Sequence, residues 1–216
     1  MTANEWSDQA STLVAQALTA AQGRDTAAIL KLENSFLQLK RQQVPGVAGA
    51  VDTAFRNAMF ALNDLRTLRS RMDLVSANCQ TVAEWLRKHP KVYQVDYLGQ
   101  PSYHLPGVAK KYMKLVDSDD GTGHEVNRYG HLMSFRVDGP PENARKVFDG
   151  FKMIYRATDL GRIKSVATIP AISTHQQQGE EARRMADVPP QLIRLCVGAE
   201  HPDDVIGDLE QALNSL

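Results

Sequence analysis

Residues 62–102 read LNDLRTLRSRMDLVSANCQTVAEWLRKHPKVYQVDYLGQPS and join a long helical pattern to a strand. Apolar residues recur here at alternating spacings of three and four, which is typical of a helix with one buried face. These residues are Leu65, Leu68, Met72, Val75, Cys79, Val82 and Leu86. Pro90 ends the helix, and VYQVDYL at 92–98 is rich in β-branched and aromatic residues, which predicts a strand.

Two more helices are expected upstream, over residues 8–21 and 25–42, with Gly23 between them. The long helix itself is expected from about residue 51 to residue 88, after the helix-breaking segment VPGVAG at 44–49. An apolar stripe on the second helix comprises Ile29, Leu32, Phe36 and Leu39, with Trp6 and Leu13 nearby. Such a stripe either covers the chain's own core or docks on a partner protein.

Downstream of residue 98, short strands alternate with helices, whereas the charged stretch DSDDGTGHEVNRYG at 117–130 is expected to be a loop. Strands are expected at 131–137, 163–169 and 192–198, and helices at 105–114, at 142–151 and from Pro202 onward. The apolar face of the last helix comprises Val205, Ile206, Leu209, Ala212, Leu213 and Leu216. This order predicts an α/β or α+β fold in which long helices flank a small mixed sheet.

Composition excludes several classes of function. Lys and Arg together number 25, equal to Asp and Glu, so the balanced charge disfavours a nucleic-acid or anionic-membrane partner. Cys79 and Cys196 have no partner at metal-ligand spacing, and we expect two buried, reduced thiols and no metal site. Because there is neither a membrane-length apolar run nor a signal-peptide pattern, we expect a cytoplasmic protein.

Three segments together resemble one enzyme family. They are residues 62–102, YGHLMSFRV at 129–137, and the C-terminal segment 159–213, which contains Leu-Gly, Pro-Ala, Thr-His, Arg-Leu-x-Val-Gly and Asp-Leu-x-x-Ala-Leu in order. Residues 59–216 are similar to the C-terminal domain of the fold type I pyridoxal-phosphate enzymes of cysteine and methionine metabolism, such as cystathionine γ-synthase, methionine γ-lyase and O-acetylhomoserine sulfhydrylase. Residues 1–58 would then be a helical extension and an interdomain helix.

The resemblance implies a place in sulfur amino-acid metabolism, as a carbon–sulfur lyase or transferase acting by β- or γ-elimination or replacement. It also implies that Arg194 holds the α-carboxylate of an amino-acid substrate, because a guanidinium can bind a carboxylate through two parallel hydrogen bonds. A structural arginine paired with an acid is the alternative. Thr158 and Asp159 are expected beside the carboxylate. Three more residues, His175, Thr174 and Ser165, are expected around the pocket.

The chain departs from the family pattern at three positions near this site. Asp159 stands where the family usually has a serine that helps to hold the carboxylate, and an acid there would repel it. Lys164 replaces a usual acid and Ile169 a usual histidine. The substrate end of the pocket is therefore either re-purposed or no longer catalytic, and Asp159 could instead pair with Arg194 or with another cation.

The sequence lacks the family's Ser-x-Thr-Lys segment, so no catalytic Schiff-base lysine is assigned to this chain and it is not expected to hold pyridoxal phosphate covalently or to be active alone. The preferred hypothesis is a small subunit of a split enzyme, in a hetero-oligomer with a larger polypeptide that binds pyridoxal phosphate. One alternative is a non-catalytic scaffold or regulatory protein. Another is a fragment of a longer enzyme, which predicts family-like sequence before residue 30, and residues 1–28 do not resemble the family.

Overall fold

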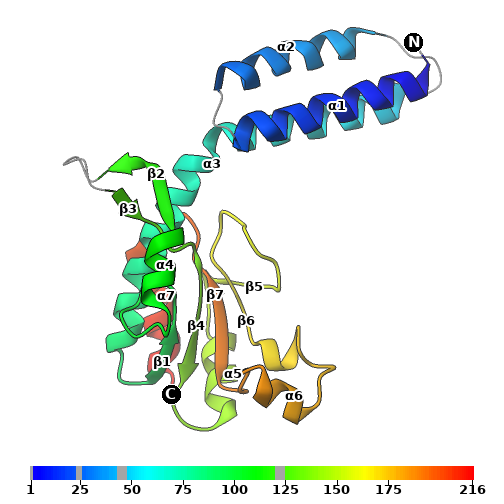
Figure 1. Cartoon of the computed structure of the whole chain (residues 1–216). Helices are drawn as coiled ribbons and strands as arrows, with labels where there is room; N and C mark the ends of the chain where they lie inside the picture. Colours follow the sequence, from blue (N-terminus) through cyan, green and yellow to red (C-terminus); the bar gives the residue numbers. More distant parts are fainter. Residues whose placement is uncertain (1, 23–25, 43–47, 120–124) are drawn as a thin grey trace. The chain divides into compact units, whose positions relative to one another are not determined.

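The computed structural model describes residues 2–22, 26–42, 48–119 and 125–216. They form two compact units, Met1–Ser70 and Arg71–Leu216, which divide within the long helix α3 (Ala48–Lys88). Figure 1 shows the elements of both units in chain order. The boundary between residues 58 and 59 that was drawn from the family resemblance stays a prediction.

The first unit consists of α1 (Ala3–Gln22), α2 (Thr26–Arg41) and the first part of α3. Phe36 on α2 is buried with Ala17 of α1 and Leu62 of α3, and Leu32 packs against the same cluster. Leu39 is buried against Trp6, whose indole nitrogen donates a 3.3 Å hydrogen bond to the Leu39 carbonyl. The stripe on α2 therefore covers the core of its own unit, as one of the two alternatives predicted. The side chain of Ile29 and the residue Gly23 lie outside the described residues.

The second unit contains the sheet and the helices around it. Its strands are β1 (Val92–Asp96), β2 (Lys114–Asp119), β3 (Glu125–Asn127), β4 (Leu132–Val137), β5 (Tyr155–Arg156), β6 (Val166–Thr168) and β7 (Leu192–Cys196). Its helices, besides the end of α3, are α4 (Pro106–Tyr112), α5 (Pro141–Asp149), the 3-10 turn η1 (Pro170–Ile172), α6 (Glu180–Met185) and α7 (Pro202–Asn214). The bounds in the two units confirm the predicted helices and four strands to within five residues, the largest difference being at the start of α1.

Five strands form one sheet in the order β1-β4-β7-β6-β5. All neighbours are antiparallel except β5 and β6, which are parallel, so the sheet is mixed as predicted. The strand β7, although it follows all the others along the chain, occupies the central position. Its residue Arg194 is paired with Ser134 of β4 on one side and with Thr168 of β6 on the other.

Helices cover one face of this sheet. Phe135, Ile193 and Leu195 are completely buried in a core that also contains residues of α3, α5 and α7. Figure 1 shows the end of α3 and α7 together on that side of the strands. Because successive strand residues point to opposite faces, Ser134 and Arg194 project from the face that lies away from this core.

Some expectations about local structure were wrong. The stretch 117–130 is only partly a loop, because β2 and β3 pair as a small antiparallel sheet of their own. Leu68 is 41% exposed, so the buried face of α3 does not include it. The short edge strand β5 was not anticipated. Both cysteines are free and buried, as predicted, and none of the described helices has the length and apolar character of a bilayer-spanning segment.

Candidate functional site

Arg194 lies on the central strand, on the sheet face opposite to the core that contains α3, α5 and α7. The pairing register places it in a row with Asp96, Ser134 and Thr168, on four adjacent strands. Side chains that are directly opposite in antiparallel strands lie on the same face with their Cβ atoms about 5 Å apart. The guanidinium is thus carried by the central strand of the sheet and is flanked by two hydroxyl side chains.

The Arg194 guanidinium has one hydrogen bond in the described structure. Its Nη2 atom donates to the carbonyl oxygen of Thr158 at 2.7 Å. No carboxylate of the described residues lies within ion-pair distance of Arg194, so its positive charge is not neutralised there. The remaining N–H groups are available to an anionic ligand. The alternative of a structural arginine paired with an acid is therefore not what the structure has.

A second arginine on the same face, Arg136, is a structural arginine that is paired with acids. Arg136 is 8% exposed and forms ion pairs with Asp187 and Asp96. Burial alone would lower the pKa of Arg136, but the hydrogen bond and charge of Asp187 outweigh it and raise that pKa above its ordinary value. Arg136 is thus neutralised within the chain, whereas Arg194 is not.

The loop that contacts Arg194 is held by its own ion pair. Asp159 pairs with Arg162, three residues along the chain, and the Arg162 guanidinium lies 5.8 Å from the centre of the Tyr155 ring. Gly161 adopts a φ of +78°, which lets the chain turn between the two charged residues. Of the two partners considered for Asp159, the structure thus has another cation and not Arg194. Its charge is compensated inside the loop.

The start of this loop is fixed by a buried carboxylate. Asp208 of α7 is 6% exposed and accepts hydrogen bonds of 2.8–2.9 Å from the backbone N–H groups of Lys152, Met153 and Ile154. These residues precede β5, which leads directly into Thr158. The helix α7 therefore sets the position of the segment that carries the Arg194 contact.

Ser165 is placed by the structure at the base of the loop. Its hydroxyl donates to Glu200 Oε2 at 3.0 Å and accepts from the Gly198 N–H at 2.9 Å. Asn78 on α3 donates to the carbonyl oxygens of both Gly198 and Glu200. Ser165 is fully buried, so its hydroxyl joins β6 to the end of β7 and has no free position for a ligand.

Thr174 and His175 lie in the turn that follows η1. The His175 ring nitrogen Nδ1 is 2.9 Å from the Thr174 hydroxyl, and the His175 N–H donates to the Pro170 carbonyl. Neither side chain has a described contact with Arg194. The turn is linked to the row of Arg194 through Ser173, whose hydroxyl lies 2.8 Å from that of Thr168.

The departures Lys164 and Ile169 differ in their surroundings. Lys164 is exposed beside the loop, whereas Ile169 is 1% exposed and belongs to the core. A side chain at position 169 therefore packs against the helices.

Ser134 and Thr168 were not among the predicted site residues, because their proximity to Arg194 depends on strand pairing. The sequence shows each strand but not which strands are neighbours.

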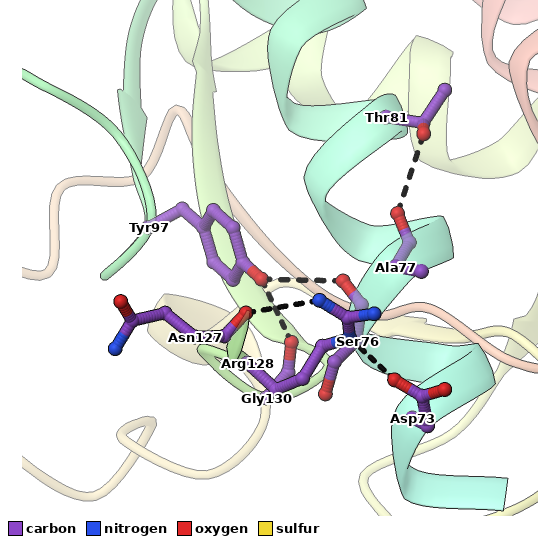
Figure 2. Close-up of polar contacts among 8 residues, drawn as sticks. All are labelled: Asp73, Ser76, Ala77, Thr81, Tyr97, Asn127, Arg128 and Gly130. Carbon is purple, nitrogen blue, oxygen red and sulfur yellow. Dashed lines mark hydrogen bonds and ion pairs between the residues drawn. The ribbon is translucent and has the colours of Figure 1, made fainter. Parts of the chain in front are cut away.

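A separate group of polar contacts lies around Tyr97, after β1. Figure 2 shows the Tyr97 hydroxyl between two carbonyl oxygens, that of Gly130 at 2.9 Å, to which it donates, and that of Ser76 at 3.5 Å. It also shows Arg128 donating to Asp73 and to the Asn127 carbonyl. Burial raises the pKa of Tyr97, so its hydroxyl stays protonated. These contacts tie α3 to the segment before β4.

The strands around Arg194 lack the group that binds pyridoxal phosphate covalently, the cofactor that the family resemblance implies. On β1, β4, β6 and β7 the residues of this face are Gln94, Asp96, Leu132, Ser134, Arg136, Val166, Thr168, Leu192, Arg194 and Cys196. None of these ten residues is a lysine, and covalent binding of this cofactor requires one. These ten residues alone therefore do not fit covalently bound pyridoxal phosphate.

Comparison with known proteins agrees with the resemblance. The family described as Cys/Met metabolism PLP-dependent enzyme matches residues 24–214. The O-acetyl-L-homoserine sulfhydrylase of Leptospira meyeri is 37% identical over 160 residues, covering 74% of this chain and 34% of that protein. The L-methionine gamma-lyase of Porphyromonas gingivalis is 33% identical over 184 residues, covering 85% of this chain and 43% of that protein.

A solved structure shows the same fold. The putative O-acetylhomoserine (thiol)-lyase of Campylobacter jejuni, which was crystallised with a pyridoxyl-lysine phosphate group, matches with a TM-score of 0.65 and 34% identity. The match covers 74% of this chain and 35% of that one, so the chain spans about a third of its relative's length. With the family matched over nearly all of its residues, the chain belongs to the Cys/Met metabolism PLP-dependent enzymes.

Proposed function

We propose that this chain supplies the substrate-carboxylate arginine, Arg194, of a pyridoxal-phosphate-dependent lyase or transferase of sulfur amino acids. A second polypeptide carries the cofactor and its lysine, and the two chains form a hetero-oligomer. One observation carries the proposal: Arg194 is a partly exposed arginine on the central strand of the sheet, without an ion pair among the described residues.

The geometry of Arg194 suits a carboxylate. The bond to the Thr158 carbonyl fixes one edge of the guanidinium, and the other N–H groups stay free for two parallel hydrogen bonds. Hydrogen bonds to a charged group contribute about 1.5–3 kcal/mol and also fix orientation. Holding the carboxylate orients the Cα–H bond of the amino acid toward the cofactor of the partner chain.

The acid at position 159 is compatible with this function. An unpaired carboxylate next to Arg194 would compete with the substrate, but Asp159 is paired with Arg162. The loop therefore presents the Thr158 carbonyl to Arg194 and keeps its own negative charge compensated. In this proposal the backbone oxygen of Thr158 orients Arg194, and Asp159 stabilises the loop through its ion pair with Arg162.

The surroundings of Arg194 favour a protein partner. Tyr155, Leu160 and Ile163 are 55%, 58% and 49% exposed, and they belong to β5 and the loop that contacts Arg194. A polypeptide that brings a cofactor within reach of Arg194 would cover them. Covering them also excludes water, which strengthens the Arg194–carboxylate interaction.

The proposal is tested by purifying the tagged chain from its native host and recording the absorbance of the resulting assembly. We expect a second polypeptide with a cofactor-binding lysine, and absorbance of bound pyridoxal phosphate at about 420 nm that changes when L-methionine is added. Arg194→Gln should preserve assembly and absorbance but abolish the response to the amino acid. Arg87→Gln, an exposed arginine on α3, is the matched control and should behave like the unmodified chain.

Two outcomes would overturn the proposal. A colourless assembly would support the non-catalytic scaffold in its place. A coloured assembly whose response to the amino acid survives Arg194→Gln would show that another group holds the carboxylate.

A further inference from the structure

A pocket of about 380 Å³ lies between α5, η1, α6 and the segment that leads into β7. Arg194 is not one of the residues that line it. Its volume is within the range of about 300–1,000 Å³ that is usual for small-molecule sites. The role proposed for Arg194 makes no use of this pocket.

Part of the lining is apolar. Ala171 and Ile172 of η1 belong to this part, together with Val188 and Pro189 from the segment before β7. Ile172 is a large aliphatic residue and is 42% exposed. Covering this side chain with an apolar group would be favourable by about 25 cal/mol for each Å² removed from water.

The charged part of the lining is mainly cationic. Arg145 of α5 and Arg184 of α6 have neither an ion pair nor a hydrogen bond from their side chains among the described residues. Arg183, which also lines the pocket, donates to the Gln178 carbonyl at 2.6 Å. Of the two acids in the lining, Asp187 is already paired with Arg136. Three lining arginines and Glu180 therefore leave an excess of positive charge.

We propose that this pocket binds a small carboxylate with an apolar body. The apolar part would lie on Ile172, Val188 and Pro189, and the carboxylate would meet Arg145 and Arg184. An apolar lining with a few polar groups is the usual design of a site that binds such molecules. Arginine suits the anionic end because its planar fork matches a carboxylate.

The pocket next to Tyr97 does not have these properties. It measures about 280 Å³, and its one arginine, Arg128, is already paired with Asp73. Figure 2 shows that the Tyr97 hydroxyl and Arg128 are bonded to groups of the same chain. A ligand there would have to displace these contacts, whereas Arg145 and Arg184 have none in the described residues to lose.

Isothermal titration calorimetry with 3-phenylpropanoate tests the proposal, on the full chain carrying Arg194→Gln, which removes the other arginine proposed to bind a carboxylate. We expect saturable binding of one molecule per chain, weakened at least about tenfold by Arg145→Gln combined with Arg184→Gln. The neutral analogue 3-phenylpropanamide should bind about tenfold more weakly than the acid, because it lacks the charge. Arg87→Gln is again the matched control and should leave the affinity unchanged.

Ile172→Ser tests the apolar part of the lining separately, because it removes apolar contact and keeps both arginines. It should weaken the binding of 3-phenylpropanoate. The weaker binding of acetate, a carboxylate without a large apolar body, should stay unchanged. The proposal is wrong if no saturable binding is seen up to about 10 mM ligand, because a dissociation constant above that concentration corresponds to a binding free energy too small for a specific site. It is also wrong if the amide binds as well as the acid, or if the double variant binds normally while its urea unfolding curve matches that of the unmodified chain.

Discussion

Arg194 on the central strand donates a 2.7 Å hydrogen bond to the carbonyl oxygen of Thr158, in the loop that follows the edge strand. In the sheet, β6 lies between the strand that carries Arg194 and the edge strand that leads to Thr158. The bond orients the arginine without neutralising it, since a carbonyl oxygen carries no net charge. The backbone thus positions Arg194, and the charge of Arg194 remains available.

We expect Arg194→Gln to cost less stability than Arg136→Gln. Arg194 is only partly buried, and its loss should lower the free energy of unfolding by about 1 kcal/mol or less. Arg136 has a side chain that is 10% exposed and bonded to Asp187, so its loss should cost about 1–3 kcal/mol. Urea unfolding of the two variants gives the ranking, and the reverse order would show that Arg194 is the structural arginine.

Asp208 should be among the most sensitive residues of the second unit. Asp208→Ala leaves the N–H groups of Lys152, Met153 and Ile154 without their acceptor, and we expect a loss of about 3 kcal/mol or more. Glu210→Ala on the same helix is the control, because Glu210 is exposed and should change stability by about 0.5 kcal/mol or less. Equal midpoints in thermal or urea unfolding would contradict this view of the loop.

Two glycines should respond to alanine in opposite directions. Gly207 lies inside α7, and no atom is within 4 Å of the place that an added Cβ would take, so alanine should stabilise the helix by about 0.5–1 kcal/mol. Gly161 has equal space but a φ of +78°, so alanine should destabilise by about 1 kcal/mol. Calorimetric melting curves distinguish the two, and a destabilising Gly207→Ala would mean that α7 packs differently.

Stability should also fall in mild acid because of His131, a half-buried histidine. Burial lowers the pKa of His131 below its ordinary value of 6.5, so the folded state favours the neutral ring. Between the folded and the unfolded pKa the unfolded chain binds more protons, and the contribution present above pH 6.5 is lost as the pH falls below that value.

The measurement for His131 compares unfolding free energies at about pH 7.5 and pH 5.5, either side of the ordinary histidine pKa. The decrease should be smaller in His131→Gln than in the unmodified chain. Part of it should remain, because burial and Lys91 also lower the pKa of His89. An unchanged decrease would mean that His131 is solvated in the folded state.

Much of this fold could be predicted from the sequence, since periodicity locates helices well. The face of α3 from Val75 to Leu86 is buried as its spacing indicated. On the predicted face of the last helix Val205, Leu209, Ala212 and Leu213 are buried, whereas Ile206 and Leu216 are only partly buried. The charged stretch after residue 116 was misjudged, because a hairpin between β2 and β3 is stabilised by backbone hydrogen bonds that side-chain composition does not reveal.

The site was harder to predict. Sequence could identify Arg194 as a candidate, but its row with Ser134 and Thr168 depends on a register between strands that lie far apart in the chain. The partner of Asp159 was left open, because a loop conformation with a positive φ at Gly161 decides between Arg162 and Arg194. Ser165 was assigned to the pocket and turned out to be bonded to Glu200, a contact across 35 positions.

The central place of β7 has a consequence for how the protein is made. Until residues 192–196 have left the ribosome, β4 and β6 have no common neighbour, and the sheet stays in two incomplete pieces. The amide of Asn78 likewise waits for the carbonyls of Gly198 and Glu200, which lie 120 and 122 residues further along. Contacts of such long sequence separation form slowly. The second unit therefore cannot assemble its sheet strand by strand during synthesis, and nascent chains will expose unpaired strand edges until β7 has emerged.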